Sequence, residues 1–285
     1  MANLKGGSFE KQNKDIFHRL SAFGTKRHGQ NSNLTHSSSL GKKRTEYSKS
    51  YAKFIANKGL SGKLNHHMNN ENIKEFLTSR TSNMGQKSTI NYYAGFGSMI
   101  QGLKDSNVDI DFDKNVITNL VNDAKNNMDK ALIKSNQAIK EPDKMIKDIS
   151  TVNFTASVIA QVQLLGYRVS EAFSIVKDIS KYYNPFTATL NNVVGKGNHT
   201  YEPKAISNNL IHKINSIDKM ISQKTYHNTL KEFNINSHQW RYTYAKNTFD
   251  KVIKAGVEYK KALKLVSVGL NHKRESMSLF YLQRS

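Results

Sequence analysis

Apolar residues in the first half of the chain recur every three or four positions, which is the period of an amphipathic α-helix. Five stretches show this period, and no convincing strand precedes about residue 180. The stretches are marked by Phe9, Ile16, Phe17 and Leu20; by Tyr47, Tyr51, Phe54 and Ile55; by Ile73, Phe76 and Leu77; by Ile90, Phe96, Met99, Ile100 and Leu103; and by Val116, Ile117, Leu120, Val121, Ala124, Met128 and Leu132. The pattern predicts a small helical bundle.

Two polar segments interrupt these helices. Residues 24–40 are rich in Ser, Asn, His and Gly, which is typical of a loop or flexible arm. Residues 135–143 (SNQAIKEPD) are polar and include one of only three prolines. We therefore expect a helical domain over 1–135, a linker over 136–143 and a second domain over 144–285.

The second half contains the only good strand signals. A helical stripe continues to Leu165 and ends at Gly166, as helices often end at glycine. From Phe186 to Val194 apolar residues alternate, the turn Gly195-Lys196-Gly197-Asn198 follows, and 199–205 is the expected return strand. This predicts a β-hairpin with a lysine at its tip. Further helices follow, including one that Ser237 would cap and Gly256 would close.

Charge and composition narrow the class of protein. Lys and Arg number 43 against 22 Asp and Glu, a formal net charge of +21, which points to a polyanionic partner. No apolar run reaches the roughly 20 residues of a membrane span, and Met1 to Gly7 lack the apolar stretch of a signal peptide. The chain has no cysteine, which excludes disulfides, zinc fingers and thiol catalysis. We expect a cytoplasmic protein that meets nucleic acid and not a membrane.

Four short segments carry candidate chemistry, and each has a plain structural interpretation when taken alone. An arginine before a Ser-Glu pair is usually a helix start, a lysine between glycines is usually turn chemistry, a His-x-x-Arg pair is common by chance, and a late tyrosine on an apolar helix is usually core. The segments are Gly166-Tyr167-Arg168-Val169-Ser170-Glu171, the hairpin tip at Lys196, His238-Gln239-Trp240-Arg241, and Leu270-Asn271-His272 with Tyr281 nine residues after the histidine.

The order of these segments resembles the catalytic domain of the tyrosine recombinases, which include lambda-integrase-like phage integrases and chromosome-dimer resolvases. The matching stretches over about residues 145–285 are GYRVSEAFSI, VVGKGN, SHQWRYTYAKN and LNHKRESMSLFY. Less specifically, GQKSTINYYAGF in the first half resembles the family's helical core-binding domain. The resemblance implies a mainly α, two-domain DNA clamp whose catalytic domain holds a small antiparallel β-sheet.

Carried over residue by residue, the resemblance gives each candidate a role. Arg168, Lys196, His238, Arg241 and His272 would surround the scissile phosphate, Tyr281 would attack it, and Glu171 would support the first arginine. Guanidiniums bind phosphate oxygens through paired donors, a lysine can protonate a leaving 5′-oxygen, and imidazoles can donate hydrogen bonds or help to deprotonate a phenol. A phosphotyrosine keeps the bond energy, so strand transfer would need neither metal nor ATP, and no cofactor is expected.

The family also implies partners. These are double-stranded DNA with inverted half-sites and a homo-tetramer on DNA that exchanges strands through a Holliday junction, in integration, excision or resolution of DNA elements. Such an enzyme would be nucleoid-associated and of prokaryotic or mobile-element origin. Basic residues of the first domain are expected to contact DNA phosphates, although a disordered arm that only aids solubility is as compatible with 26–44. These basic residues are Lys26, Arg27, Lys42, Lys43, Arg44 and Lys87.

The chain departs from the family pattern in three places. Asn271 stands where glycine is usual, and asparagine is among the few residues that tolerate left-handed backbone. After the hairpin lysine, residues 199–202 (HTYE) hold no lysine or arginine before Pro203, so DNA contact from that strand is open. Only Leu282 to Ser285 follow the tyrosine, whereas many members have a longer C-terminal helix that docks on a neighbouring subunit.

Three alternatives stay open. A type IB-like topoisomerase shares the arginines, the lysine and the tyrosine, although His238 and the two-domain layout favour a recombinase. A metal-dependent nuclease or transposase could use Asp109-x-Asp111-x-Asp113, which we instead interpret as a loop in which Asp113 or a neighbour caps the next helix. A non-catalytic DNA-binding protein would suit the charge, but all six catalytic positions are filled.

Overall fold

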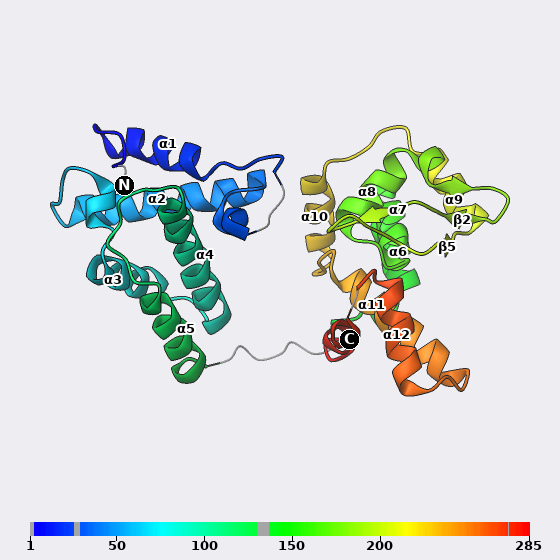
Figure 1. Ribbon diagram of the computed structural model, residues 1–285. Coiled ribbons are helices and arrows are strands. Elements are labelled where there is room, and N and C mark those ends of the chain that lie inside the picture. The colour runs from blue at the N-terminus through cyan, green and yellow to red at the C-terminus, as the bar shows by residue number, and fades with distance from the viewer. Residues whose placement is uncertain (1–2, 26–28, 130–136, 273) are drawn as a thin grey trace. The chain divides into compact units, whose positions relative to one another are not determined.

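The computed structural model describes residues 3–25, 29–129, 137–272 and 274–285 (Figure 1). The chain separates into two compact units, Met1–Leu132 and Ile133–Ser285, called unit 1 and unit 2 below. Helices dominate both units, and the strands of unit 2 pair in small antiparallel sheets. The predicted fold class, mainly α with a small antiparallel β component, is confirmed.

Unit 1 is helical throughout its described elements, and a helix forms in each of the five predicted stretches. The fifth helix ends at Asn127, before Met128, and Leu132 of that stretch lies outside the described residues. The elements are α1 (Phe9–Leu20), η1 (Gly29–Asn33), α2 (Ser38–Asn57), η2 (Leu64–His67), α3 (Asn70–Thr81), α4 (Gln86–Asp105) and α5 (Asn115–Asn127). Three helices begin at a polar cap whose side chain accepts a backbone N–H of the first turn. The capping residues are Ser8, Ser37 and Asn69.

The core of unit 1 is built around α4, which packs against α1, α2, α3 and α5. At its centre Tyr51, Phe76 and Phe96 form a triangle of rings with centroids 5.1–5.6 Å apart. Offset and edge-to-face aromatic contacts of this kind add to the burial of apolar area. The Tyr51 hydroxyl donates to the backbone carbonyl of His67 at 2.5 Å, so the polar end of this buried ring is satisfied.

The expected arm of unit 1 is more ordered than its composition predicts. The segment 24–40 includes η1 and the start of α2, and Thr35 pairs with Ser21. Arg44 lies inside the unit, 3% exposed, where its Nη1 donates to Thr35 Oγ1 and its Nη2 to Ser98 Oγ, both at 3.1 Å. This differs from the predicted DNA contact, because the guanidinium is used to hold the segment after η1, at Thr35, and α4 to α2. Lys42, Lys43 and Lys87 are exposed as expected, while Lys26 and Arg27 lie outside the described residues.

The aspartates at 109, 111 and 113 alternate because they lie on the exposed side of an extended segment whose other side is buried. Ile110 and Phe112 point inward, and Asp109, Asp111 and Asp113 are exposed between and beside them. Lys114 is the N-cap of α5, and Asp113 just before it accepts the backbone N–H of Asn115 through Oδ1 at 2.9 Å, so its side chain bonds the start of the helix as the loop interpretation expects. Among the described residues, no group of three His, Asp or Glu side chains is placed to hold a metal ion. Over the same residues, no helix has the length and apolar character needed to cross a membrane.

The helical elements of unit 2 surround the site discussed below. They are α6 (Pro142–Val152), α7 (Phe154–Leu164), α8 (Val169–Lys177), η3 (Ile179–Lys181), α9 (Asn208–Asn215), α10 (Gln223–Glu232), α11 (Gln239–Lys254), α12 (Tyr259–Gly269) and α13 (Glu275–Leu282). The predicted helical stripe that ends at Leu165 forms α7, and Val152 at its start belongs to α6 instead. The extended backbone of Asn153 ends α6, and its side chain caps α7. The last two residues of the predicted linker, Pro142 and Asp143, already belong to α6.

The strands are much shorter than the sequence predicts. β1 (Tyr183–Asn184), β2 (Thr189–Leu190) and β5 (Lys204–Ala205) form one antiparallel sheet in the order β1-β2-β5. β3 (Val194–Gly195) and β4 (His199–Thr200) form the hairpin with Lys196 at its tip, as expected. One continuous strand from Phe186 to Val194 is wrong, because Ala188 and Asn192 have positive φ of 50° and 56° that reverse the chain, and Phe186 is 97% exposed.

Unit 2 holds two apolar clusters. The larger one is centred on α7, which packs against α6, α8, α9 and α11 (Figure 1). It includes the buried Trp240. The smaller one joins α11, α12 and α13 and has Tyr281 at its centre, with Val266 and Leu270. The candidate residues therefore lie where the large helical core meets a small three-helix cluster.

Candidate active site

Three helix ends and one helix bring most of the candidate residues together. Arg168 is the N-cap of α8, two residues after Gly166, whose φ of +92° ends the preceding helix turn. His238 is the N-cap of α11, and Arg241 follows in the first turn of that helix. His272 lies between α12 and α13, and Tyr281 lies on α13. Unit 2 thus supplies the whole cluster.

Tyr281 is enclosed by the other candidates and is only 3% exposed. Its hydroxyl is 3.3 Å from Arg241 Nε and 3.2 Å from His238 Nε2. Because an arginine can only donate, the phenol oxygen accepts from Arg241 and the phenol proton is free to point at His238. The rings of His238 and His272 each lie 5.5 Å from the tyrosine ring, centroid to centroid. This is the geometry of a phenol with a base on one side and a cation on the other.

Arg241 is fully buried, with 0% exposure, and each of its nitrogens donates inside unit 2. A guanidinium has five N–H donors, and five acceptors surround this one. They are Tyr281 Oη, the Gly166 carbonyl, Tyr201 Oη at 3.2 Å, the Leu270 carbonyl at 2.9 Å and His272 Nε2 at 3.3 Å. Arg241 therefore ties the turn before α8 to the turn after α12, while its Nε faces the tyrosine.

Arg168 is bound by Glu171 on one side of its guanidinium, and, in the part of the chain that the structure describes, the other side has free N–H donors. Glu171 Oε2 accepts the backbone N–H of Arg168 at 2.7 Å, which is a capping contact, and Oε1 accepts from Nη1 at 3.1 Å. Nη1 also donates to the Tyr201 hydroxyl at 3.1 Å. Within the described residues, Nε and Nη2 have no acceptor. The plain capping interpretation and the expected support by Glu171 are both present in one residue pair.

The two histidines are held in the neutral state. Enclosure of the ring, followed by the nearby charges of Arg241 and Arg168, lowers the pKa of His238 to about 4. The same causes in the same order lower the pKa of His272 to about 4. His272 Nε2 accepts from Arg241 Nη2, so its ring proton is on Nδ1. At neutral pH both imidazoles are then available as proton acceptors or as neutral hydrogen-bonding groups.

Lys196 lies apart from this cluster. It is exposed at the tip of the β3–β4 hairpin, and it forms no hydrogen bond or ion pair with the other candidates within the described residues. The hairpin itself is attached to the site, since Asn271 Nδ2 donates to the His199 carbonyl at 2.8 Å. Asn271 has φ of 54°, so its expected left-handed conformation is confirmed. The structure therefore gathers Arg168, Glu171, His238, Arg241, His272 and Tyr281, and leaves the lysine on an adjoining hairpin.

Two residues of the site were missed by sequence reasoning. Tyr201 places its hydroxyl between both arginines. Lys204 is enclosed by the rings of Tyr167, Tyr201 and Tyr244, with Nζ 4.8, 5.2 and 4.4 Å from their centroids. Its Nζ donates to the carbonyls of Leu165 and Gly269, both at 2.5 Å.

No local pattern could have identified these two residues. The carbonyl partners of Lys204 lie 39 and 65 positions away in the sequence, and a lysine in a short strand ordinarily faces solvent. The sequence offered one indirect hint: residues 199–202 hold no lysine or arginine before Pro203, so this segment departs from the pattern that the rest of the site resembles.

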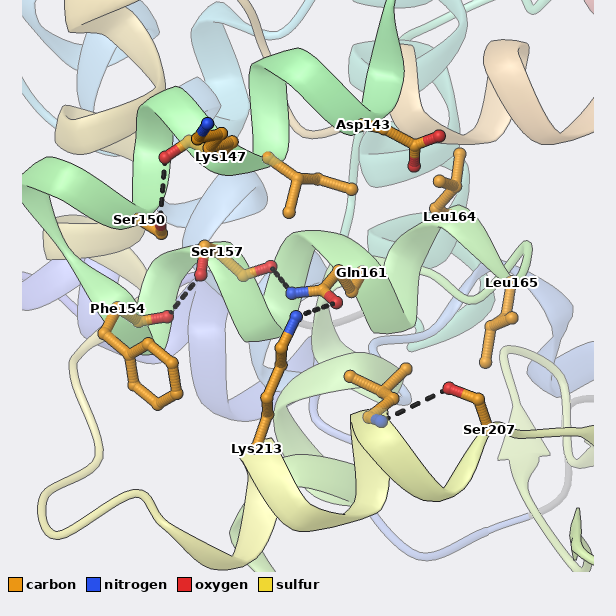
Figure 2. A pocket seen from close by; sticks show the side chains of 12 residues that line it. Asp143, Lys147, Ser150, Phe154, Ser157, Gln161, Leu164, Leu165, Ser207 and Lys213 are labelled. Carbon is orange, nitrogen blue, oxygen red and sulfur yellow. Dashed lines mark hydrogen bonds between the residues drawn. The ribbon is translucent and has the colours of Figure 1, made fainter.

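A groove of about 470 Å³ lies elsewhere on unit 2, between α6, α7 and α9 (Figure 2). Phe154 and Leu210 contribute apolar surface, and Lys213 Nζ donates to Gln161 Oε1 at 3.2 Å across it. None of the candidate residues lines this groove. It is a separate feature from the cluster around Tyr281.

Among the comparisons with known proteins, one solved structure bears on the fold. No protein-family model matches the chain, and no curated protein is significantly similar in sequence. Among solved structures, the chain is similar to a XerH site-specific recombinase bound to a palindromic difH substrate in a post-cleavage complex. The TM-score is 0.57 and the identity 14%, over 94% of this chain and 90% of that one. A XerA recombinase also matches, with a TM-score of 0.33 and 12% identity over 86% and 87% of the two chains. The XerH likeness shows that the chain has the same fold.

Proposed function

We propose that the chain is a site-specific DNA recombinase that cleaves and rejoins DNA with Tyr281 as its nucleophile. The observation that carries the proposal is the position of the Tyr281 hydroxyl between His238 Nε2 and Arg241 Nε. The fold shared with the XerH recombinase and the net charge of +21 support DNA as the substrate.

His238 activates the nucleophile in this proposal. A phenol is a weak nucleophile at neutral pH, and a general base within hydrogen-bond reach can remove its proton as it attacks. The neutral Nε2 of His238 is 3.2 Å from the hydroxyl and can take the proton. Arg241 Nε already donates to the same oxygen and stabilises the negative charge that develops there.

The phosphate is bound by the arginines, and the leaving oxygen is protonated by the lysine. The open Nε and Nη2 of Arg168 can pair with non-bridging phosphate oxygens, and Arg241 and His272 add donors as their internal partners are exchanged. The Tyr281 oxygen forms a bond to phosphorus, the bond to the 5′-oxygen breaks, and Lys196 on the adjoining hairpin gives that oxygen a proton. The products are a 3′-phosphotyrosyl bond and a free 5′-hydroxyl.

Rejoining reverses these steps with the 5′-hydroxyl of another strand. Because the phosphotyrosyl bond conserves the energy of the broken phosphodiester, the reaction needs no ATP, and the proposal assigns no step to a metal. Strand exchange between two duplexes requires four such sites, so we propose a homo-tetramer on DNA with inverted half-sites and a Holliday-junction intermediate. Unit 1 would add phosphate contacts through exposed lysines such as Lys42, Lys43 and Lys87.

The test is covalent capture of DNA. The DNA flanking the gene is first searched for a segment that the purified protein protects from nuclease. A duplex containing that segment is nicked just past the scissile phosphate, so that the short fragment that carries the new 5′-hydroxyl diffuses away after cleavage. This duplex should then accumulate a protein–DNA adduct with wild-type protein. The variant Tyr281→Phe keeps the ring and should form no adduct. An adduct of equal yield in this variant would overturn the proposal.

A second substrate tests the leaving-group role and the choice of reaction. Lys196→Ala should cleave the normal duplex slowly and a duplex with sulfur at the scissile 5′-bridging position at a wild-type rate, because sulfur leaves without a proton. A supercoiled plasmid with two protected sites should yield recombinants with wild-type protein. Relaxation of plasmid with no recombinant product would instead identify a topoisomerase.

A further inference from the structure

The hydroxyl of Tyr201 joins three charged side chains of the site. The residue follows β4 of the lysine hairpin and is 4% exposed. Its hydroxyl donates to Glu171 Oε2 at 2.6 Å and accepts from Arg168 Nη1 at 3.1 Å and from Arg241 Nη1 at 3.2 Å. A phenol has one proton and two lone pairs, so all three are used, one on each charged group.

The protonation state of Tyr201 suits this role. Burial, ahead of the opposing effect of Arg241 and the raising effect of the Glu171 carboxylate, raises the pKa of Tyr201 to about 12. The hydroxyl therefore keeps its proton at neutral pH and can donate to Glu171 while it accepts from both guanidiniums. Without it, Arg168 would keep Glu171 and Arg241 would keep the Gly166 carbonyl, but within the described residues no hydrogen-bond partner would be common to both arginines.

The ring and backbone of Tyr201 are fixed as firmly as the hydroxyl. Its ring centroid is 4.8 Å from that of Tyr167, and its backbone N–H donates to the Val193 carbonyl at 2.9 Å. Gly195 approaches it so closely that a Cβ there would lie 2.9 Å from Tyr201 Cε2. One side chain thus connects the hairpin that carries Lys196 to both arginines.

We propose that Tyr201 is a positioning residue for DNA cleavage: its hydroxyl sets the spacing of the Arg168 and Arg241 guanidiniums so that both meet one phosphate. The proposal rests on the proposed function. Tyr201 touches no reacting atom, and it acts through the arginines. An unpositioned guanidinium can still bind DNA, but it donates poorly to the charge that develops during attack, and misplacements of about 1 Å cost roughly 100-fold in rate.

The test compares Tyr201→Phe with wild type on two nicked duplexes of the same protected sequence. One duplex has a normal scissile phosphate, and the other has an uncharged methylphosphonate at that position. Loss of the hydroxyl should slow adduct formation about 10- to 100-fold on the phosphate at saturating DNA, with DNA affinity nearly unchanged. On the methylphosphonate the rate difference between wild type and Tyr201→Phe should be at least several-fold smaller, because one of the charged oxygens that the arginines bind is replaced by a methyl group.

A matched control removes a different buried hydroxyl. Tyr51→Phe deletes the hydroxyl that donates to the His67 carbonyl in the core of unit 1, and it should leave both rates within about three-fold. The ratio of the two rates is taken within one protein sample, so it does not depend on the fraction of Tyr201→Phe that is folded.

Each outcome decides between the two proposals. No adduct from wild-type protein overturns the proposed function and the positioning role together. Wild-type activity with Tyr201→Phe as fast as Tyr51→Phe overturns the positioning role alone. Equal slowing of Tyr201→Phe on both duplexes also overturns it, since that result indicates a general structural defect.

Discussion

Lys204 provides a direct test of the electrostatics of unit 2. Burial, followed by the nearby charge of Arg241, lowers the pKa of Lys204 from 10.5 to about 7, against a raising effect of Glu171. Between these two values the unfolded chain binds a proton that the folded chain does not. Folding stability then rises with pH across this window, because the unfolded state binds more protons. The charged lysine therefore destabilises unit 2 most at neutral and lower pH.

The size of the effect follows from the two pKa values. Each pKa unit corresponds to about 1.4 kcal/mol, and over most of the interval from about pH 7 to about pH 9.5 the unfolded chain still binds the proton that the folded chain has lost. The contribution of Lys204 to the free energy of unfolding should rise by about 3 kcal/mol over that interval. Lys204→Met keeps the length of the stem and removes the titrating group, so this rise should disappear in the variant.

The assay is urea unfolding followed by tryptophan fluorescence. Trp240 is the only tryptophan of the chain and is buried in unit 2, so the signal reports on that unit. Wild type and Lys204→Met are measured at several pH values between 7 and 9.5, and their difference cancels titrations that both proteins share. Lys254→Met, which removes an exposed lysine at the end of α11, controls for the loss of a charge.

Parallel pH dependence of wild type and Lys204→Met would refute the reasoning. It would mean that the three tyrosine rings and two carbonyls around Nζ compensate fully for the loss of water. The net change at pH 7 has two opposing parts. The variant is relieved of the desolvated charge, but it leaves the carbonyls of Leu165 and Gly269 without a donor, at about 1–3 kcal/mol each.

Three further predictions concern the site and the DNA contacts. Because the pKa of His238 is lowered to about 4 in the free protein, kcat/KM for adduct formation should stay level down to about pH 5.5, and a half-loss near pH 6.5 would contradict this. Lys87→Ala should reduce the slope of log K against log salt for DNA binding by about one, measured by fluorescence anisotropy; an unchanged slope would exclude a phosphate contact. Asn271→Gly keeps the left-handed backbone but loses the bond to the His199 carbonyl, so unit 2 should lose about 1 kcal/mol in urea and hairpin amides should exchange faster. Unchanged exchange at the hairpin would show that this bond does not hold it.

The parts of the site that the sequence predicts depend on the spacing of residues that are close together along the chain. The interval of three between His238 and Arg241 places both in the first turn of one helix, and Gly166 sets the turn from which Arg168 caps the next. Asn271 could be assigned a left-handed conformation because few residues adopt it. Each of these inferences needs only neighbours along the chain. The helical period of unit 1 was predictable for the same reason.

The parts that the sequence does not predict depend on distant partners. Arg44 was grouped with surface charges, but Thr35 and Ser98 satisfy it in the interior, and the second of these is 54 residues away. The long strand expected from Phe186 failed because positive φ at Ala188 and Asn192 overrides the alternation of side chains. Tyr201 and Lys204 belong to the same class, since their roles arise from contacts between turns that meet only in the folded unit.

The five internal acceptors around Arg241 have a consequence for ligand selection. A free inorganic anion that approaches this guanidinium must break existing hydrogen bonds and gains about as many as it breaks, so such an exchange is close to neutral in free energy. A phosphate within a duplex arrives with many further contacts along its backbone, and these can drive the exchange. Under the proposed function, the internal hydrogen bonds of Arg241 compete with the phosphate, so Tyr281 and Arg241 would be released to a phosphate only when the rest of the DNA is bound as well.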